Sequence, residues 1–166
     1  MNGMMDPARL DAFLRDRRVG VLAIPREGRP PLSTPIWYDW DGRRVRMQVE
    51  ATSAKAKLLG RAGGTLRVTL TVQAEAPPYR YAVLYGPALL GANEPGLRRR
   101  IADRYFGRMA GGMYVQQEEA AGRNESALRV VEMVPDRVAS QDFGPDAGRF
   151  GRVYFALWRW LHPTRA

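Results

Sequence analysis

The sequence predicts a mainly β protein in which six or more antiparallel strands form a closed or partly closed barrel with helices at its rim. Three observations lead to this fold class. Short runs rich in β-branched and aromatic residues recur between Val19 and Phe143. Glycine, proline and aspartate separate these runs, as is typical of tight turns. The segments with helical periodicity are short and stand between the strands.

The chain begins with a predicted helix followed by a predicted strand. Asp6 and Pro7 have the residue types of an N-cap and a first helical position, and apolar residues at spacings of three and four follow up to Leu14. The apolar run 19–24 is then predicted as a strand. The turn at 26–29 leads directly into the next strand, so these elements form a meander.

A β-hairpin is predicted next. Asp41-Gly42 stands between runs rich in β-branched and aromatic residues, at 32–40 and 43–50. This pair is a strong hairpin signal, because glycine accepts the positive φ of a tight primed turn. The two runs are therefore predicted to be paired antiparallel strands.

A phosphate-binding helix start is predicted directly after the hairpin. Thr52 and Ser53 have N-cap residue types, and helix-compatible residues follow up to Leu59. The free N–H groups of such a helix start favour an anion. Of the 26 basic residues only Lys55 and Lys57 are lysines, and lysine is a common phosphate ligand. Residues two apart do not share a helix face, so both reach one phosphate only if the first turn is irregular. The alternative interpretation is a solvated basic helix face.

The rest of the chain is predicted to add strands on either side of two helices. Residues 65–72 alternate between polar and apolar side chains, which indicates a half-buried strand. The further predicted elements are a strand at 79–85 that continues weakly to Leu90, a helix at 94–106, a glycine-rich break at 107–112, a short helix at 113–121, and strands at 127–134 and 137–143.

Composition excludes several classes of site. The chain has no cysteine and one histidine, His162, so thiolate metal sites, cysteine nucleophiles, His-cluster zinc sites and Ser-His-Asp catalysis are not expected. The net charge is +9, but the arginines are spread along the chain and no zinc-finger, RNP or basic-zipper pattern is present, so no nucleic-acid partner is expected. The N-terminus lacks a signal-peptide pattern, which predicts a cytoplasmic protein.

Residues 149–166 form a separate C-terminal segment after a predicted domain at 1–148. Eight large apolar residues, three of them tryptophan or tyrosine, crowd between Phe150 and Leu161, and arginines interrupt them. We favour a helix that packs on its own barrel or on a partner subunit. The minority interpretation is a helix that lies on a membrane surface.

Three motifs in a fixed order carry a resemblance to a known superfamily. They are Pro-x-x-x-Pro-Ile-Trp-Tyr-x-x-Asp-Gly at 31–42, Thr-Ser-x-Lys-x-Lys-Leu at 52–58 and Tyr-x-Tyr-Ala-Val-Leu-Tyr-Gly-Pro-Ala at 79–88. Together they resemble the split β-barrel flavin and deazaflavin oxidoreductases, which include pyridoxamine 5′-phosphate oxidase. The first two motifs are most similar to the branch that uses the deazaflavin coenzyme F420.

The resemblance implies a homodimer of six-stranded split barrels of the FMN-binding type, with cofactor sites at the dimer interface. It also implies roles for twelve residues. The cofactor phosphate would be held by Thr52, Ser53, Lys55 and Lys57. The cofactor ring would be lined by Pro35, Ile36, Trp37, Met47, Gln48 and Val49. The other subunit would contribute Tyr79 and Arg80. The alternative interpretation is that Trp37, Met47 and Val49 belong only to the barrel core or to an interface.

The function expected from the resemblance is hydride transfer between reduced coenzyme F420 and a planar conjugated organic substrate. The cofactor supplies the redox chemistry, and the protein supplies position and electrostatic field. No catalytic side chain stands out, and Tyr38, Tyr79 and solvent remain candidates for a proton donor. One alternative is an FMN-dependent oxidase or reductase closer to pyridoxamine 5′-phosphate oxidase, although the C-terminal substrate motif of that enzyme is not matched. The other is a non-catalytic barrel that carries a flavin or haem.

Overall fold

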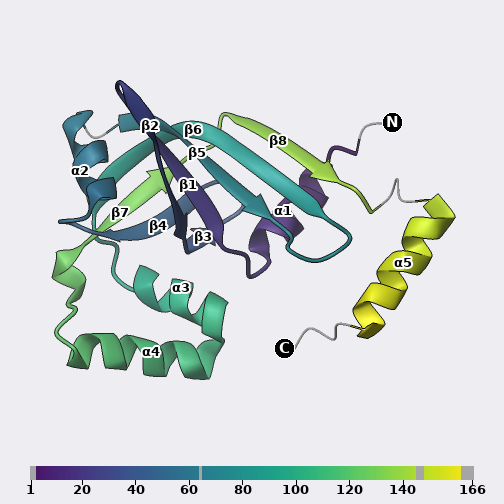
Figure 1. Cartoon of the computed structure of the whole chain (residues 1–166). Coiled ribbons are helices and arrows are strands. Elements are labelled where there is room, and N and C mark those ends of the chain that lie inside the picture. Colours follow the sequence, from purple (N-terminus) through teal and green to yellow (C-terminus); the bar gives the residue numbers. More distant parts are fainter. Residues whose placement is uncertain (1–2, 64, 145–147, 162–166) are drawn as a thin grey trace.

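The computed structural model describes residues 3–63, 65–144 and 148–161, and within them eight antiparallel strands and five α-helices (Figure 1). The strands are β1 (Gly20–Arg26), β2 (Arg29–Ile36), β3 (Tyr38–Trp40), β4 (Val45–Glu50), β5 (Thr65–Gln73), β6 (Arg80–Ala92), β7 (Leu128–Met133) and β8 (Arg137–Asp142). The helices are α1 (Pro7–Arg15), α2 (Ala54–Arg61), α3 (Leu97–Phe106), α4 (Arg108–Ala120) and α5 (Gly148–Leu161), with a 3-10 turn at Glu125–Ala127.

The sheet curls round so that its two end strands meet at one residue. Its strand order is β2-β1-β5-β6-β7-β4-β3. The strands at the two ends, β2 and β3, are consecutive in the chain, and only Trp37 separates them. A sheet whose opposite ends are joined by one residue must bend into a barrel, although no hydrogen-bonded ladder pairs β2 with β3. Trp37 is therefore the corner of the barrel.

Strand β6 is the point at which the barrel splits. Its second half, from Ala88 to Ala92, pairs with β7, and its first half, from Arg80 to Tyr85, pairs with β8. Gly86 lies at the division. A Cβ atom there would come within 2.6 Å of the Val134 carbonyl oxygen, in the link from β7 to β8. Glycine is required at this position because another backbone passes directly over it.

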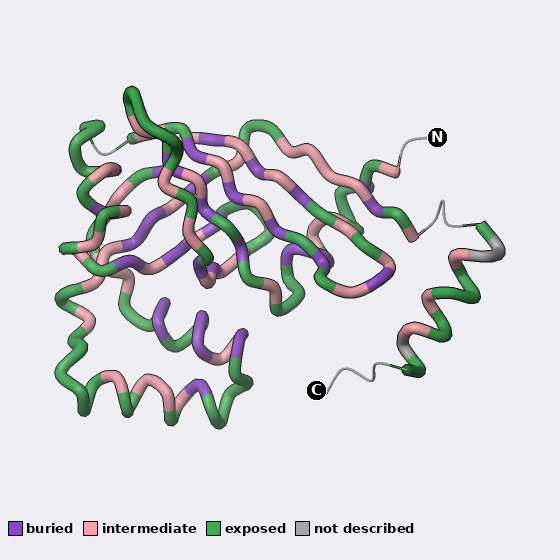
Figure 2. Tube along the Cα trace, viewed as in Figure 1, coloured by how far each residue is buried: buried purple, intermediate pink, exposed green. Residues whose placement is uncertain are grey.

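One apolar core fills the barrel, and α1 covers part of it. Alternate residues of β5 point inward, as the sequence pattern predicted, so Val68, Leu70 and Val72 are buried. The inner positions appear in purple along the strands in Figure 2. Helix α1 begins at the predicted N-cap, where the Asp6 side chain accepts a hydrogen bond from the Arg9 amide. Its Phe13 belongs to the same core.

Helices α3 and α4 form an antiparallel hairpin between β6 and β7. The predicted glycine-rich break at 107–112 is wrong, because α4 already begins at Arg108 and contains both Gly111 and Gly112. A Cβ atom on Gly111 would lie 2.7 Å from the Asp103 backbone nitrogen of α3. Gly111 thus allows close packing of the two helices, and Gly107, with a φ of 81°, ends α3.

Three other details differ from the sequence prediction. Eight strands are present within the described residues where the resemblance implied six. The predicted strand at 32–40 is divided at Trp37, since its first part pairs with β1 and its second part with β4. The Asp41-Gly42 hairpin has a four-residue loop, since Trp40 pairs with Val45. The Asp41 carboxylate accepts the backbone N–H groups of Arg43 and Arg44, which stabilises that wider loop.

The C-terminal segment contains the helix α5, which Figure 1 draws apart from the barrel. The predicted segment 149–166 thus corresponds to a helix that begins at Gly148, and residues 162–166, with His162, lie outside the described residues. No helix in the described part of the chain has the length and apolarity needed to cross a bilayer.

Candidate functional site

A pocket of about 470 Å³ lies between the barrel and the α3–α4 hairpin. One wall is formed by the ends of β2 and β4, by Trp37 and by the start of α2. The other wall is formed by α3 and α4. The residues that line it are Val19, Pro35, Ile36, Trp37, Gln48, Val49, Glu50, Ser53, Lys55, Arg98, Ile101, Ala102, Tyr114, Glu118 and Leu128.

Seven of the twelve residues proposed from the sequence line this one pocket. They come from three separate segments of the chain: Pro35, Ile36, Trp37, Gln48, Val49, Ser53 and Lys55. The fold brings these segments together because β2 turns at the barrel corner and β4 leads directly into α2. The residues assigned to the ring and those assigned to the phosphate therefore face one common space.

The other five proposed residues do not line the pocket. Met47 is fully buried in the barrel core. Thr52 and Lys57 are exposed beside the pocket. Tyr79 is 48% exposed, and Arg80 lies 5.6 Å from the centre of the Phe13 ring. The described structure contains one chain, so the predicted contribution of Tyr79 and Arg80 to a second subunit stays a prediction.

The start of α2 has the predicted N-cap. Ser53 adopts an extended backbone, and its hydroxyl accepts the Ala56 amide at 3.2 Å. The helix is regular from Ala54 onward, so Lys55 and Lys57 lie on different faces. Lys55 is half-buried in the pocket wall, whereas Lys57 is exposed. The positive end of α2 and a single ammonium group therefore face the pocket together.

An aromatic cluster holds Trp37 at the pocket wall. Its ring stacks on Tyr105 of α3 at 5.1 Å and 18°, and meets Phe106 and Tyr114 edge-on. Tyr105 is fixed in turn, because its hydroxyl donates to the Arg18 carbonyl at 2.7 Å and accepts the Tyr38 amide at 3.3 Å. The half-buried Trp37 thus gives the pocket a flat surface with a fixed orientation.

A chain of polar side chains fixes Gln48 in the barrel wall. Its Nε2 donates to the side-chain oxygen of Asn93 at 2.8 Å, and the Asn93 amide nitrogen donates to Glu125 at 3.4 Å. With the nitrogen of Gln48 engaged, its carbonyl oxygen remains an acceptor. The wall therefore presents a positioned hydrogen-bond acceptor between the aromatic corner and the helix start.

Arg98 is a pocket residue that the sequence reasoning missed. It belongs to the run 98–100, which was interpreted only as part of the dispersed basic charge. Its side chain is 7% exposed, and its Nη1 has no hydrogen-bond partner within the described parts of the chain. The available signal was its spacing, because Arg98 precedes Ile101 and Ala102 by three and four residues and so shares their buried face.

The tyrosines near the pocket differ in what they can donate. Tyr38 was a candidate proton donor, but it is fully buried, and its hydroxyl donates to the Leu14 carbonyl at 3.1 Å, away from the pocket. Burial raises the pKa of Tyr38 to about 12. Tyr114 lines the pocket instead, and burial together with the neighbouring Glu118 carboxylate raises the pKa of Tyr114. Both are protonated at neutral pH.

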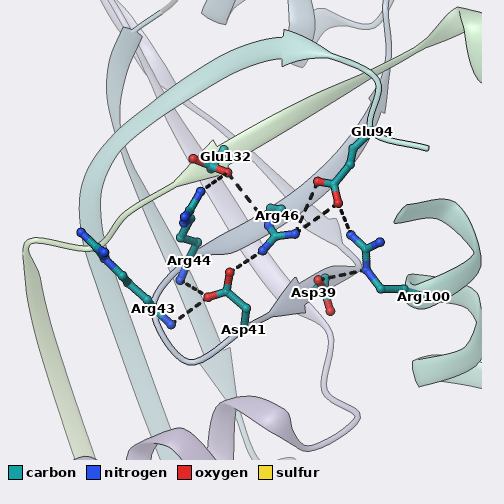
Figure 3. Close-up of polar contacts among 8 residues, drawn as sticks. All are labelled: Asp39, Asp41, Arg43, Arg44, Arg46, Glu94, Arg100 and Glu132. Atoms are coloured by element: carbon teal, nitrogen blue, oxygen red, sulfur yellow. Dashed lines mark hydrogen bonds and ion pairs between the residues drawn. The ribbon is translucent and has the colours of Figure 1, made fainter. Parts of the chain in front are cut away.

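A network of ion pairs fixes α3 to the hairpin of β3 and β4 (Figure 3). Arg46 of β4 contacts Asp41, Glu94 and Glu132. Arg100 of α3 contacts Glu94 and lies 3.7 Å from Asp39. Burial by itself would raise the pKa of Glu94, but Arg100 and Arg46 hold it below its usual range. The network therefore positions the helix that carries Arg98 against the barrel wall.

The comparisons with known proteins support the fold assignment. No protein-family model and no curated protein matches the sequence. A solved structure of a conserved hypothetical protein from Mycobacterium tuberculosis is 24% identical, with a TM-score of 0.66 over 84% of this chain and 86% of that one. A putative pyridoxamine 5′-phosphate oxidase from Listeria innocua is 16% identical, with a TM-score of 0.59 over 81% and 96%. The chain has the split β-barrel fold. An F420 reductase shares it at 17% identity, with a TM-score of 0.55 over 78% and 94%.

The split-barrel structure thus confirms the fold class expected from the sequence. At these sequence identities the solved structures establish the fold only. Within the described residues, no group of three histidine, cysteine, aspartate or glutamate side chains is placed to hold a metal ion. The pocket thus combines four features that a ligand could use. They are the cationic start of α2, the buried guanidinium of Arg98 on α3, the flat ring of Trp37 and the positioned side-chain carbonyl of Gln48.

Proposed function

We propose that this chain is a flavin- or deazaflavin-dependent oxidoreductase that transfers a hydride between reduced coenzyme F420 and a planar, conjugated organic substrate. One observation carries the proposal. A single pocket combines a helix start suited to a phosphate, at Ser53 and Lys55, with a flat wall suited to an aromatic ring, at Pro35, Ile36 and Trp37. A phosphorylated tricyclic cofactor needs both features at once.

The residues present fit such a cofactor. Lys55 and the first amides of α2 would hold its phosphate. Ile36, Trp37 and Val49 would contact the ring, and the carbonyl oxygen of Gln48 would accept a hydrogen bond from a ring N–H. When bound, the cofactor supplies the hydride. The chain itself contributes binding, a fixed orientation and the exclusion of water from one side of the pocket.

Two features favour coenzyme F420 over FMN. The pocket has a second cationic residue on its helical wall, which suits a cofactor with anionic groups beyond one phosphate. An F420 reductase is also among the solved structures with this fold. FMN remains the alternative cofactor, because Lys55 and the α2 start would equally hold its terminal phosphate.

The experiment is a pair of titrations followed by an activity assay. Purified protein is titrated with FMN and with coenzyme F420, and binding is measured by cofactor fluorescence. We expect saturable binding of F420 that is tighter than binding of FMN, and oxidation of reduced F420 in the presence of quinone or other conjugated acceptors. Binding of neither cofactor would contradict the proposal. Binding without turnover of any acceptor would favour a carrier role.

We further propose that the functional unit is a homodimer, with Tyr79 and Arg80 of one copy completing the pocket of the other. Tyr79 is exposed directly before β6, and Tyr81 on that strand is exposed as well. Aromatic and arginine side chains of this kind are enriched at protein interfaces. This arrangement would close the side of the pocket that a single chain leaves open.

A further inference from the structure

Arg98 presents a buried cation to the pocket that has no anionic partner within the described residues. The two arginines that follow it form ion pairs, since Arg99 pairs with Asp103 at 2.7 Å and Arg100 pairs with Glu94. Arg98 differs from both, because it is 7% exposed and its Nη1 has no hydrogen-bond partner among the residues described. The three consecutive arginines thus have different environments, and only Arg98 belongs to the pocket lining.

The acidic residues of the pocket do not compensate this charge. Glu118 lines the same wall, but its carboxylate pairs with Arg123 at 3.0 Å. Glu50 is exposed at the opposite wall. A buried cation without a partner is strongly unfavourable, because it has lost its hydration and gained no counter-charge. An anion bound next to Arg98 would supply the missing counter-charge.

We propose that Arg98 forms an anion subsite on the α3 wall that binds a phosphate or carboxylate group of the molecule in the pocket. It is separate from the Ser53–Lys55 subsite on the α2 wall, so the pocket accepts a ligand with anionic groups at two places, or a cofactor together with an anionic substrate. The planar guanidinium suits either oxyanion, because it can donate two parallel hydrogen bonds. The identity of the ligand rests on the proposed function, whereas the anion subsite rests on Arg98 itself.

The test compares Arg98→Met with Arg61→Met. Methionine keeps much of the length of the arginine side chain and removes its charge. Arg61 is an exposed residue in the last turn of α2, outside the pocket, so its substitution makes the same change in net charge. Thermal unfolding is measured with inorganic phosphate, pyrophosphate and acetate as probes, and affinity is measured by titration with FMN and coenzyme F420.

We expect the wild-type melting temperature to rise with phosphate or pyrophosphate. In Arg98→Met the ligand-free melting temperature should equal or exceed that of the wild type, because an unpaired buried charge has been removed. Its response to the anions should be weaker than that of the wild type, because only the Ser53–Lys55 subsite remains, and cofactor affinity should fall at least tenfold. Arg61→Met should behave as the wild type. Arg98→Lys, which keeps the charge without the planar fork, should retain part of the affinity.

The source of the anion follows from the arms of the experiment. A loss of FMN or F420 affinity in Arg98→Met assigns the subsite to the cofactor. Unchanged cofactor affinity with a weaker response to acetate assigns it to a substrate carboxylate. A lower ligand-free melting temperature with wild-type responses to every anion would overturn the subsite and show a structural role. If neither cofactor binds the wild type while the Arg98-dependent phosphate response persists, the proposed function fails and the subsite stands.

Helix α5 carries a second, independent inference. It exposes an apolar surface whose members recur at spacings of three and four residues: Val153, Tyr154, Leu157, Trp160 and Leu161, each 46% to 78% exposed. The segment 148–161 contains three arginines and no acidic residue, in a chain of net charge +9. Arg152 is exposed as well. These five side chains are therefore not packed on the barrel, and the packing on a partner subunit that the sequence analysis also allowed stays a prediction.

We infer that α5 binds the surface of an anionic membrane. The charge of the segment complements anionic lipid headgroups, and tryptophan, tyrosine and leucine are the side chains that enter the headgroup boundary. No described helix is long and apolar enough to span a bilayer, so α5 would lie in the plane of the membrane. In that position its apolar face is buried and the exposed Arg152 can reach lipid phosphates.

The test is vesicle flotation of the full chain. Wild type is compared with Leu157→Ser plus Trp160→Ser, and with Leu89→Ser on β6, a residue of similar exposure outside α5. We expect binding to vesicles that contain phosphatidylserine, weak binding to pure phosphatidylcholine and at least fivefold weaker binding by the α5 variant alone. Equal flotation of all three proteins would overturn the inference. So would a failure of wild type to float while the α5 variant loses an oligomeric state, since the face would then be a protein interface.

Discussion

Lys55 and Lys57 are the only two lysines of the chain, and the structure gives them different environments. Lys55 lines the pocket at the start of α2, and Lys57 points to solvent on another face of the same helix. The sequence could predict that an anion site begins here, because the N-cap and the lysines are adjacent. It could not decide which lysine faces the pocket, since this depends on the regularity of the first turn.

The first prediction uses this difference. Lys55→Ala should weaken cofactor binding by about 1.5–3 kcal/mol, the usual value of a charge-assisted hydrogen bond. Lys57→Ala should change it less than twofold, because that ammonium remains hydrated. Both affinities are measured by fluorescence titration with FMN and coenzyme F420. Equal losses in the two variants would show that the first turn of α2 rearranges on binding.

The second prediction concerns the buried hydroxyl of Tyr38. Its pKa is raised from 10.0 to about 12 by burial. The folded and unfolded states are equally protonated below about pH 10, so Tyr38 adds no pH dependence there. Above that pH the unfolded state releases a proton that the folded state retains, and the free energy of unfolding should fall by about 2–3 kcal/mol toward pH 12.

Urea unfolding of wild type and Tyr38→Phe at pH 8 and pH 11 measures this effect. At pH 8 the variant should be less stable by about 1 kcal/mol, because the hydrogen bond to the Leu14 carbonyl is lost. At pH 11 the difference should shrink or reverse. A constant difference between the two pH values would place the pKa of Tyr38 near its ordinary value.

At the scale of elements, the pocket depends on how closely α3 and α4 pack. Glycine at 107–112 suggested a loop, because glycine weakens isolated helices. In the structure Gly111 is buried where α4 touches the backbone of α3. A sequence alone does not distinguish a glycine that breaks a helix from a glycine that allows two helices to touch, since the difference lies in a tertiary contact.

Gly111→Ala should therefore destabilise the protein by about 1–3 kcal/mol, the range seen for overpacked contacts. Its Cβ would lie 2.7 Å from the Asp103 nitrogen, so α4 must move, and with it Tyr114 and Glu118 of the pocket wall. Gly112→Ala is the matched control. Its Cβ would meet only the end of the Arg99 side chain at 3.1 Å, and alanine favours the helix by about 0.5–1 kcal/mol. Chemical unfolding of both variants measures the contrast, and equal stabilities would exclude the backbone contact.

The ion-pair network around Arg46 is the second determinant at this scale. The Arg46 side chain is 17% exposed and contacts three carboxylates. Arg46→Met should cost about 1–3 kcal/mol at neutral pH, because it leaves those carboxylates partly uncompensated. The pKa values of Asp41 and Glu94 are lowered in the fold. Their contribution to stability is therefore present above about pH 4 and lost as the pH falls below it.

The loss caused by Arg46→Met should accordingly be largest near pH 7 and smaller near pH 3, as measured by urea unfolding at both values. Arg67→Met serves as the control. Arg67 pairs with Asp136 at 2.7 Å, but its side chain is 67% exposed, and such surface pairs contribute about 0–1 kcal/mol. If the two variants lose the same stability, the network adds nothing beyond isolated pairs.

At the scale of the whole molecule, the fold class and the order of elements could be predicted from the sequence. This was possible because polar and apolar residues alternate along the strands, and residue types that favour turns stand between them. The division at Trp37 was not predictable from periodicity, since Ile36, Trp37 and Tyr38 keep the alternation of a single strand. Nothing in the sequence indicated that β6 pairs with β8 along its first half and with β7 along its second half. Arg98 was missed because the charge of the arginine run was considered without its helical phase, although the spacing to Ile101 and Ala102 places Arg98 on the buried face of the helix.

The final prediction concerns assembly. Light scattering on the purified chain should give twice its mass of 18.7 kDa, because the proposed pocket needs Tyr79 and Arg80 of a second copy. Tyr79→Ala should weaken cofactor binding severalfold or shift the protein toward monomer, and a monomeric wild type that binds cofactor at full affinity would contradict the dimer. Light scattering thus tests the dimer, and vesicle flotation tests the role of α5 separately.

The α3–α4 hairpin, Leu97–Ala120, leaves the barrel after β6 and returns to it before β7, and these two strands are already neighbours in the sheet. It is thus a helical hairpin inserted into the connection between two adjacent strands. Exchanging it for another helical hairpin would redesign one whole side of the ligand-binding surface, Arg98 included, and would also remove the ring contacts of Tyr105 and Phe106 that hold Trp37 on the other side.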